Sequence, residues 1–295
     1  MLSPPAVGLV TRNLLKGEYK KSLIQDSYHI VYNMAYMAKS HENYRELVMR
    51  IAKTDFKLRY HGSVLGYVWV ILKPLLMFSI LNFVFSSIFN YRNSGTPYYP
   101  LELLTGLLLF QFFSEATMTG LTSLVNKAQL VTKIYVPRWT IVLGSTMNAL
   151  FVFGMNLIVL AAFFLFYHKV PTPLGIGMFI IYSILLYVLA VVFSFLTAPL
   201  FVRFRDLSTI WEVLLSALMY ASPIIYPLTT LPARYRQIIL LNPLAYIINY
   251  SKEGLINGSF TTFWHFMAML AGICAAGVIS LLVFKKYEKT VAELI

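Results

Sequence analysis

The sequence predicts an all-α integral membrane protein with six transmembrane helices. Of its 295 residues, 58% are hydrophobic and only 12% are charged, and the mean hydropathy is +0.69. A soluble domain is usually about 45–50% apolar and about 25% charged, so this composition excludes one. The apolar residues gather into long segments, and the net charge of +12 comes from cations in the intervening loops. A soluble nucleic-acid-binding protein is therefore excluded despite the basic balance.

The first 61 residues are predicted to form a basic cytoplasmic region. Met1–Tyr60 lacks a continuous apolar core, so we expect no cleavable signal peptide. Between Tyr44 and Phe56, apolar residues recur at i, i+3 and i+4, which predicts an amphipathic helix along the membrane surface. The alternative is a packed helix of a small soluble domain. About 40 further residues are available for such a domain, which are too few.

Residues 62–286 are predicted to form a six-span transmembrane domain, followed by a cytoplasmic tail over 287–295. Each apolar segment is near or above the ~20 residues that cross about 30 Å of hydrocarbon. The predicted spans are Val64–Phe89, Leu101–Leu124, Trp139–Tyr167, Leu174–Phe201, Leu207–Tyr226 and Thr261–Phe284. Between the last two, Ile238–Ile256 is interrupted by Asn242-Pro243, so a pair of short re-entrant or interfacial helices is expected.

The distribution of cations predicts the orientation. Eighteen of them lie on the side that holds both ends of the chain, and Lys73 lies inside the first span. The five on the other side are Arg92, Lys169, Arg234, Arg236 and Lys252. Because cytoplasmic loops carry the excess of Lys and Arg, both termini are predicted to be cytoplasmic. The expected location is the bacterial plasma (inner) membrane.

A short basic segment, Asn126–Arg138, separates the second and third spans. Leu130 and Ile134 fall at i, i+4 spacing, which predicts one or two helical turns that end before Pro137. A helix this short cannot anchor itself in a bilayer, so we expect it to present a face to another protein. An ordinary positive cytoplasmic loop is the alternative.

The sequence contains little that points to catalysis. There is no GxxxxGK[ST] phosphate loop, and the five histidines are scattered without metal-ligand spacing, so no metal or cofactor is expected on this chain. Glu115 and Lys73 are the clearest intramembrane charges, and Glu212 lies nearer a span end. For Glu115 the alternatives are a polar path and a packing contact; for Lys73, a side chain that snorkels to the interface is favoured.

Aromatic residues make up 16% of the chain. Tyr and Trp rings can stack on sugar faces while exposing a polar tip, so rings deep in the spans are compatible with a sugar path. For most of them, helix packing or lipid contact is the simpler interpretation. The candidate channel aromatics are Phe78, Phe110, Phe113, Tyr182, Trp211 and Tyr220.

Four pieces in this order resemble a known family. They are Asp55–Pro74, Asn126–Arg138 ending in Tyr-Val-Pro-Arg, Arg205-Asp206, and Ser222–Tyr226 followed by Leu241-Asn242-Pro243-Leu244. Together they resemble the membrane permease subunit of ABC exporters for polysaccharides and polyol phosphates, such as O-antigen, capsule and teichoic acid exporters. Lys252-Glu253 is a departure, since such permeases often carry an arginine there. Asp206 can also cap the start of the fifth span.

The resemblance implies a homodimer that works with two separate ABC ATPase subunits, which hold ATP and Mg. It implies export of a lipid-linked polysaccharide, with an undecaprenyl pyrophosphate carrier, through a channel between the two copies. The coupling residues would be Lys127, Gln129, Leu130, Lys133, Ile134, Tyr135, Pro137 and Arg138. The entrance would use Arg50, Lys53, Lys57 and Arg59, for which simple attraction to anionic headgroups is the alternative. Structural or gating roles would fall to Arg205, Asp206, Pro223, Asn242 and Pro243.

Three other functions compete with this interpretation. A proton-coupled carrier would need inverted repeats and a partner for Glu115, and neither is evident. A membrane-embedded glycosyl or acyl transferase would need acidic or histidine clusters at one membrane face, and Asp206 and Glu212 are too sparse. A permease of the same ABC class could instead export a drug or a small lipid. The permease is expected not to be an enzyme itself.

Overall fold

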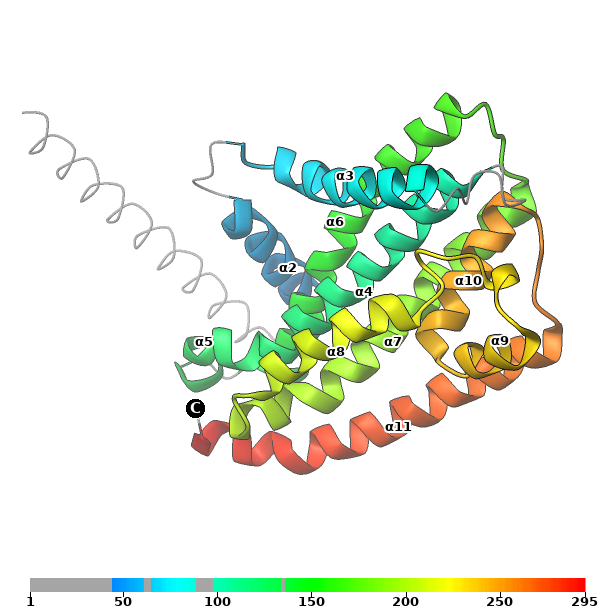
Figure 1. The fold of residues 1–295 in the computed structure, drawn as a ribbon. Helices are drawn as coiled ribbons and strands as arrows, with labels where there is room; N and C mark the ends of the chain where they lie inside the picture. Colours follow the sequence, from blue (N-terminus) through cyan, green and yellow to red (C-terminus); the bar gives the residue numbers. More distant parts are fainter. Residues whose placement is uncertain (1–43, 61–64, 89–97, 134–135, 295) are drawn as a thin grey trace, which may run out of the picture.

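A computed structural model describes residues 44–60, 65–88, 98–133 and 136–294 of the chain (Figure 1). Every regular element in these ranges is helical, in agreement with the predicted all-α class. The elements are α2 (Tyr44–Tyr60), α3 (Val68–Asn82) with a π-helical turn η1 (Phe83–Ile88), α4 (Tyr99–Asn126), α5 (Ala128–Lys133), α6 (Arg138–Phe166), α7 (Pro173–Arg203), α8 (Leu207–Ala221), a 3₁₀ turn η3 (Leu228–Thr230), α9 (Ala233–Leu240), α10 (Pro243–Ile256) and α11 (Phe263–Leu294). The predicted basic region before Tyr44 lies outside the described residues.

The long helices form a bundle around α4. Helix α4 packs against α6 and α7, and also against α3, α8 and α10. Of its membrane-length window, 78% is buried within the chain, against 11% to 33% for the other four membrane-length helices. Helices α2 and α5 lie at the end of the bundle where α11 finishes, and α9 and α10 lie at the opposite end (Figure 1).

Within the described ranges, five helices are long and apolar enough to cross a membrane, and they coincide with five of the six predicted spans. They are Val68–Ser86, Tyr99–Asn126, Arg138–Phe166, Pro173–Arg203 and Phe263–Glu288. The fifth predicted span, Leu207–Tyr226, is helical only over α8, whose 15 residues reach about 22 Å at about 1.5 Å per residue. Pro223 disfavours a helical conformation at Ser222, so the helix ends at Ala221. The count of six crossings therefore stays a prediction.

Helix α2 lies where the amphipathic helix was predicted, and the structure shows what its apolar stripe touches. Leu47, Val48, Ile51 and Ala52 are buried, and the helix packs against α6. A Cβ added at Gly144 of α6 would lie 2.6 Å from the Cγ2 atom of Ile51, so the two helices approach closely. The stripe is thus covered by protein. A position of α2 at the membrane surface remains a prediction.

The segment between α8 and α11 contains the predicted pair of short helices. The side chain of Asn242 caps α10 by accepting a hydrogen bond from the Leu244 amide at 3.0 Å, and Pro243 occupies the first turn. Most of α10 is buried against α7 and α4. A Cβ at Gly175 would lie 2.5 Å from the Gly254 carbonyl oxygen, so only glycine permits this contact. Helix α10 therefore docks into the bundle, whereas α9 has no buried residue and packs on α10.

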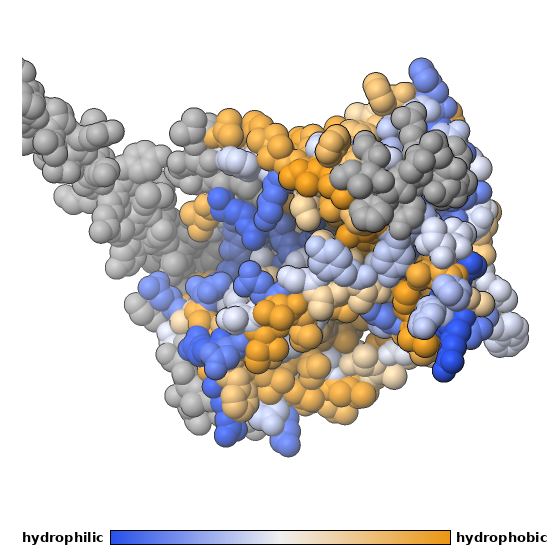
Figure 2. Space-filling model, viewed as in Figure 1, coloured by the Kyte–Doolittle hydropathy of each residue, from blue (hydrophilic) through white to orange (hydrophobic). Residues whose placement is uncertain are grey.

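The face of the bundle seen in Figure 2 is largely apolar along the helices and polar near α5 and between α3 and α8. Figure 2 shows hydrophobic residues over α3 and over α8 and α11, with hydrophilic residues near α5 and between α3 and α8. Exposed apolar side chains include Ile80 on α3, Phe83 on η1, Val213 on α8 and Leu282 on α11. Large exposed apolar surface is what lipid or another membrane subunit covers.

Candidate functional site

One face of α4 carries a row of polar side chains. Gln111, Glu115, Thr119, Thr122 and Asn126 recur at intervals of three or four residues, which places them on one side of the helix. Two cavities open along this row. Because the rest of α4 is packed in the bundle core, the row is the part of the helix that faces open space.

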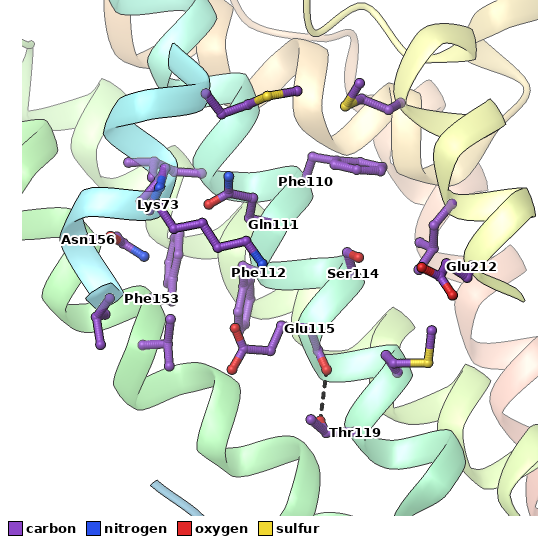
Figure 3. A pocket seen from close by; sticks show the side chains of 18 of the residues that line it. Lys73, Phe110, Gln111, Phe112, Ser114, Glu115, Thr119, Phe153, Asn156 and Glu212 are labelled. Atoms are coloured by element: carbon purple, nitrogen blue, oxygen red, sulfur yellow. Dashed lines mark hydrogen bonds between the residues drawn. The ribbon is translucent and has the colours of Figure 1, made fainter. Parts of the chain in front are cut away.

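The first cavity, here called the central cavity, lies between α3, α4, α6 and α8 and has a volume of about 890 Å³. Figure 3 shows Lys73 reaching from α3 into the space that also holds Gln111 and Glu115, with Glu212 on the α8 side. Five aromatic side chains line the walls: Trp69, Phe110, Phe112, Phe153 and Tyr220. The cavity therefore combines polar groups with rings at membrane depth.

Glu115 has a partner that the sequence did not reveal. The guanidinium of Arg59, at the end of α2, donates a hydrogen bond to the Glu115 carboxylate and forms an ion pair with it. Lys73 lies on the opposite wall of the same cavity (Figure 3). The two partners are 56 residues apart, so no helical spacing connects them. The pair ties α2 to the middle of α4.

The second cavity, here called the α2 cavity, lies beneath α2 and is bounded by α4, α5 and α6, with a volume of about 710 Å³. At its rim the Lys127 ammonium lies 2.7 Å from the Asp55 carboxylate and donates a second hydrogen bond of 2.7 Å to Ser145. Arg59 and Thr119 line both cavities. The two spaces are therefore neighbours along the polar row of α4.

The four predicted entrance cations divide between two faces of α2. Arg50 pairs with Glu46 at 3.0 Å, and Lys53 and Lys57 are exposed. These three follow one another at helical spacing, whereas Arg59 lies on the opposite face and points to Glu115. The structure thus brings Arg59 to the cavities and leaves the other three on the outside of the helix.

The predicted coupling segment is helical over α5, as expected. Gln129 is exposed, whereas Leu130 is buried in the core and Lys127 turns inward to Asp55. Ile134 and Tyr135, together with the Lys133 side chain, lie outside the described residues. Pro137 occupies the N-cap position of α6, and Arg138 donates a hydrogen bond to the Glu288 carbonyl of α11.

The predicted channel aromatics also divide. Phe110 and Tyr220 line the central cavity, whereas Phe78, Phe113, Tyr182 and Trp211 are buried in the core. Trp211 stacks on Phe193 with ring centroids 3.9 Å apart and donates a 3.0 Å hydrogen bond to Thr117. The prediction missed the cavity rings Trp69, Phe112 and Phe153. Trp69 precedes Lys73 by one helical turn, and that spacing was the available signal.

The residues predicted to shape the helix ends have defined positions. Arg205 lies over the Phe201 ring, with its guanidinium carbon 5.8 Å from the centroid. Asp206 occupies the N-cap position of α8, but its side chain makes no capping hydrogen bond, so that prediction is wrong. Its backbone is already α-helical (φ −71°, ψ −12°), whereas a capping side chain needs an extended residue.

Sequence reasoning also missed a buried charged cluster at the opposite end of the bundle. Lys252 was counted as an outer-loop cation, yet it is only 3% exposed and donates a hydrogen bond to the Pro223 carbonyl. Glu102 of α4 is buried nearby and accepts a 3.2 Å hydrogen bond from Asn257. Burial lowers the pKa of Lys252, and the Glu102 and Glu253 carboxylates partly offset this effect. The cluster joins α4, α10 and the turn after α8.

The part of the chain that the structure describes contains no group of three or more His, Cys, Asp or Glu side chains that could hold a metal ion. What the site offers is volume, aromatic surface and hydrogen-bonding groups. Membrane-length helices packed around α4, with a polar, ring-lined cavity on one side of that helix, define a polytopic membrane protein.

Residues 46–256 match the ABC-2 type transporter family, and the chain belongs to that family. Two relatives are O-antigen export system permease proteins RfbA of Klebsiella pneumoniae, 30% and 29% identical, each aligned over 90% of this chain and 98% of its own length. A third is the polysialic acid transport protein KpsM of Escherichia coli, 22% identical over 69% of this chain and 79% of its own. The resemblance seen in the sequence is thereby confirmed.

Proposed function

We propose that this chain is the permease subunit of an ATP-driven exporter that moves a lipid-linked polysaccharide from the cytoplasmic side across the inner membrane. The observation that carries the proposal is the alignment with O-antigen export permeases over 98% of their length. A capsule-type or teichoic-acid-type polymer is the same class of substrate. The undecaprenyl pyrophosphate carrier and the direction of transport are parts of this proposal.

The central cavity supports a glycan as the substrate. Sugar rings have apolar faces that stack on aromatic side chains and hydroxyls that need hydrogen-bonding partners. The walls carry Trp69, Phe110 and Tyr220 together with Gln111 and Ser114. Apolar surface on α3 and α8 flanks the cavity (Figure 2). A second copy of the chain would cover this surface and complete a channel between the two protomers.

The energy source in this proposal is a separate pair of ATPase subunits, which carry ATP and Mg. The sequence has no GxxxxGK[ST] phosphate loop of its own. Helix α5 lies at the end of the bundle beside the end of α11 and exposes Gln129 (Figure 1). That end is the cytoplasmic one if the excess of cations faces inward. Helix α5 would then be the coupling contact, and the chain would not hydrolyse ATP itself.

The lipid pyrophosphate would meet the exposed face of α2. Lys53 and Lys57 are unburied there and adjoin the Arg50–Glu46 pair. A helix with cations on its outer face attracts phosphate groups at a membrane surface. Arg59 is engaged with Glu115 and belongs to the cavities instead.

The test is co-expression with candidate ATPase subunits, followed by purification and reconstitution. The chain alone should show no ATPase activity, and the complex should hydrolyse ATP and move lipid-linked glycan. The double variant Gln129→Ala/Lys133→Ala should uncouple the pair and lower ATPase activity at least fivefold. Its matched control is Arg234→Ala/Gln237→Ala, which changes two exposed residues on α9 at the opposite end. Transport without any ATPase would overturn the proposal.

Two alternatives give different results in the same assay. A drug or small-lipid exporter of this family would hydrolyse ATP with the partner but respond to those compounds and not to glycan. A proton-coupled carrier is favoured by one observation, the charged pair Arg59–Glu115 in a cavity with Lys73. In that case an ionophore that collapses the proton gradient would stop transport, and removal of ATP would not.

A further inference from the structure

The α2 cavity is lined mainly by side chains that form hydrogen bonds without carrying charge. Eight of the fourteen described residues that line it have a hydroxyl or an amide group. The hydroxyls are those of Thr54, Thr119, Thr122, Ser123 and Ser145, and the amides are those of Asn126, Gln129 and Asn148. A volume of about 710 Å³ is within the range of about 300–1,000 Å³ that is usual for small-molecule sites. The cavity can therefore hold a polar ligand of one or two rings.

The hydroxyls facing this cavity mainly offer acceptors. Thr119, Thr122 and Ser123 each donate their proton to a backbone carbonyl of α4, at 2.8, 3.0 and 2.6 Å. A hydroxyl that has given up its proton in this way still has two oxygen lone pairs. On Thr122 one of them already accepts a 3.1 Å hydrogen bond from the Asn126 amide, which leaves one for a ligand. A ligand that fits these positions must bring hydrogen-bond donors.

Asn148 adds an acceptor that is buried and unsatisfied. It is 2% exposed and lines the cavity, and its Oδ1 atom has no hydrogen-bond partner among the described residues. A buried carbonyl oxygen without a partner costs about 1–3 kcal/mol, so most such groups in folded proteins are bonded. A donor from a bound ligand would satisfy it.

The two cations among the described lining residues are each paired with a carboxylate. Lys127 pairs with Asp55 and also donates to Ser145, and Arg59 pairs with Glu115. A phosphate brings only acceptors and negative charge, so it would need free donors and uncompensated cations. Both cations of the described lining are paired with a carboxylate, so the lining has no uncompensated positive charge for a phosphate. A neutral, hydroxyl-rich molecule matches both the acceptors and the charge balance.

From these contacts we infer that the α2 cavity is a binding site for a neutral sugar residue, with Asn148 Oδ1 and the α4 hydroxyls accepting from its hydroxyl groups. The site lies within one protomer and is separate from a channel between two copies. The inference rests on the proposed function for the origin of the sugar, which would be a residue of the exported glycan. Arg59 and Thr119 line both the α2 cavity and the central cavity. A sugar bound in the α2 cavity would therefore lie next to the proposed transport path.

The experiment measures sugar binding to the full chain in nanodiscs without an ATPase. The probes are methyl glycosides of glucose, galactose, mannose and N-acetylglucosamine, compared with the matching sugar 1-phosphates, by saturation-transfer NMR and calorimetry. At least one neutral glycoside should bind, and it should bind no more weakly than its 1-phosphate. Tighter binding of the phosphates by tenfold or more would overturn the inference, as would an absence of binding by all neutral probes.

Variants locate the binding. Thr122→Val and Asn148→Leu remove acceptors without changing charge, and each should weaken glycoside binding at least fivefold. Asn126→Ala changes an exposed amide that also lines the cavity. It replaces Asn148→Leu as the test of binding if that buried variant does not fold. The matched control is Thr229→Val, an exposed threonine at the opposite end of the bundle, which should bind as the unmodified chain does. Equal binding by Thr122→Val and the control would place the sugar elsewhere and overturn the inference.

The outcome is separable from that of the proposed function. A chain that couples to an ATPase and exports glycan, yet binds sugar equally well in all variants, retains the proposed function and loses this site. A chain that binds glycosides in the α2 cavity but has no ATPase partner retains the site and loses the exporter.

Discussion

The Asp55 carboxylate on α2 lies 2.7 Å from the Lys127 ammonium at the turn between α4 and α5. Four residues later on α2, Arg59 pairs with Glu115 in the middle of α4. The side chains of Asp55 and Lys127 are 23% and 16% exposed, so this ion pair is intermediate between a surface pair and a buried pair. Helix α2 is therefore fastened to α4 by charge on one side and to α6 by apolar packing on another.

We predict that Asp55→Asn destabilises the protein by about 1–2 kcal/mol. This cost is larger than that of breaking an exposed ion pair and smaller than that of breaking a fully buried one. For a chain of this size that corresponds to a fall in Tm of roughly 2–8 °C, measurable by scanning fluorimetry in detergent. The matched control is Glu46→Gln, which removes an exposed pair with Arg50 and should shift Tm little. The swap Asp55→Lys/Lys127→Asp should recover part of the loss, and no recovery would argue against a direct pair.

Gly120 of α4 is predicted to tolerate no side chain. A Cβ there would lie 2.1 Å from the Ser194 hydroxyl and 2.7 Å from the Thr146 methyl, so α4, α6 and α7 would have to separate. Gly120→Ala should cost about 1–3 kcal/mol by overpacking. Gly154→Ala is the control, because a Cβ there meets nothing within 4 Å, and it should stabilise helix α6 by about 0.5–1 kcal/mol. Equal Tm values for both variants would contradict the close approach.

Trp211 and Tyr220 of α8 are predicted to act differently although both were candidate channel rings. Trp211→Phe removes the hydrogen bond to Thr117 and part of the stack on Phe193, which should cost about 1–3 kcal/mol of stability. Tyr220→Ala removes a ring that is 63% exposed in the central cavity, so Tm should change little while glycan transport falls. Thermal melting and transport by the reconstituted complex distinguish the two. If Trp211→Phe lowered transport without changing Tm, Trp211 would act as a channel residue and this prediction would be wrong.

Lys252 and Glu102 are both buried and interact electrostatically, so they are predicted to be coupled. Lys252→Met removes the hydrogen bond to the Pro223 carbonyl and the positive charge near Glu102, which should cost about 1–3 kcal/mol. The double variant Lys252→Met/Glu102→Gln removes both charges and should recover part of that loss. Stability of each variant would be followed by thermal melting. Additive losses in the double variant would show that the two side chains do not interact.

Much of the helical framework could be predicted from the sequence because it depends on local runs. The core of α6 was expected at Trp139–Tyr167 and is found at Arg138–Phe166, since a continuous apolar run fixes a membrane-length helix. The short length of α8 could not be read from hydropathy alone, because Ser222–Tyr226 is apolar enough to continue the run. Its end depends on the conformation that Pro223 imposes.

The candidate site was less predictable because its parts meet only through tertiary packing. Glu115 was recognised as an unusual intramembrane charge, but Arg59 is 56 residues away on another helix. Lys252 looked like a loop cation because its neighbours are polar, and its burial follows from the docking of α10 against α4 and α7. The polar row of α4 could have been found from spacing alone, since Gln111, Glu115 and Thr119 repeat every four residues.

The burial of α4 has a consequence for how the chain enters a bilayer. Its mean hydropathy of 1.2 is the lowest of the five membrane-length helices, whose others range from 2.0 to 2.6. Glu115 on a lone helix in lipid would add several kcal/mol to the cost of insertion. Helix α4 is therefore poorly suited to partition into lipid on its own. We expect it to associate with neighbouring helices such as α3 and α6 as it leaves the insertion machinery. The helix at the centre of the finished bundle is the one least able to reach the membrane alone.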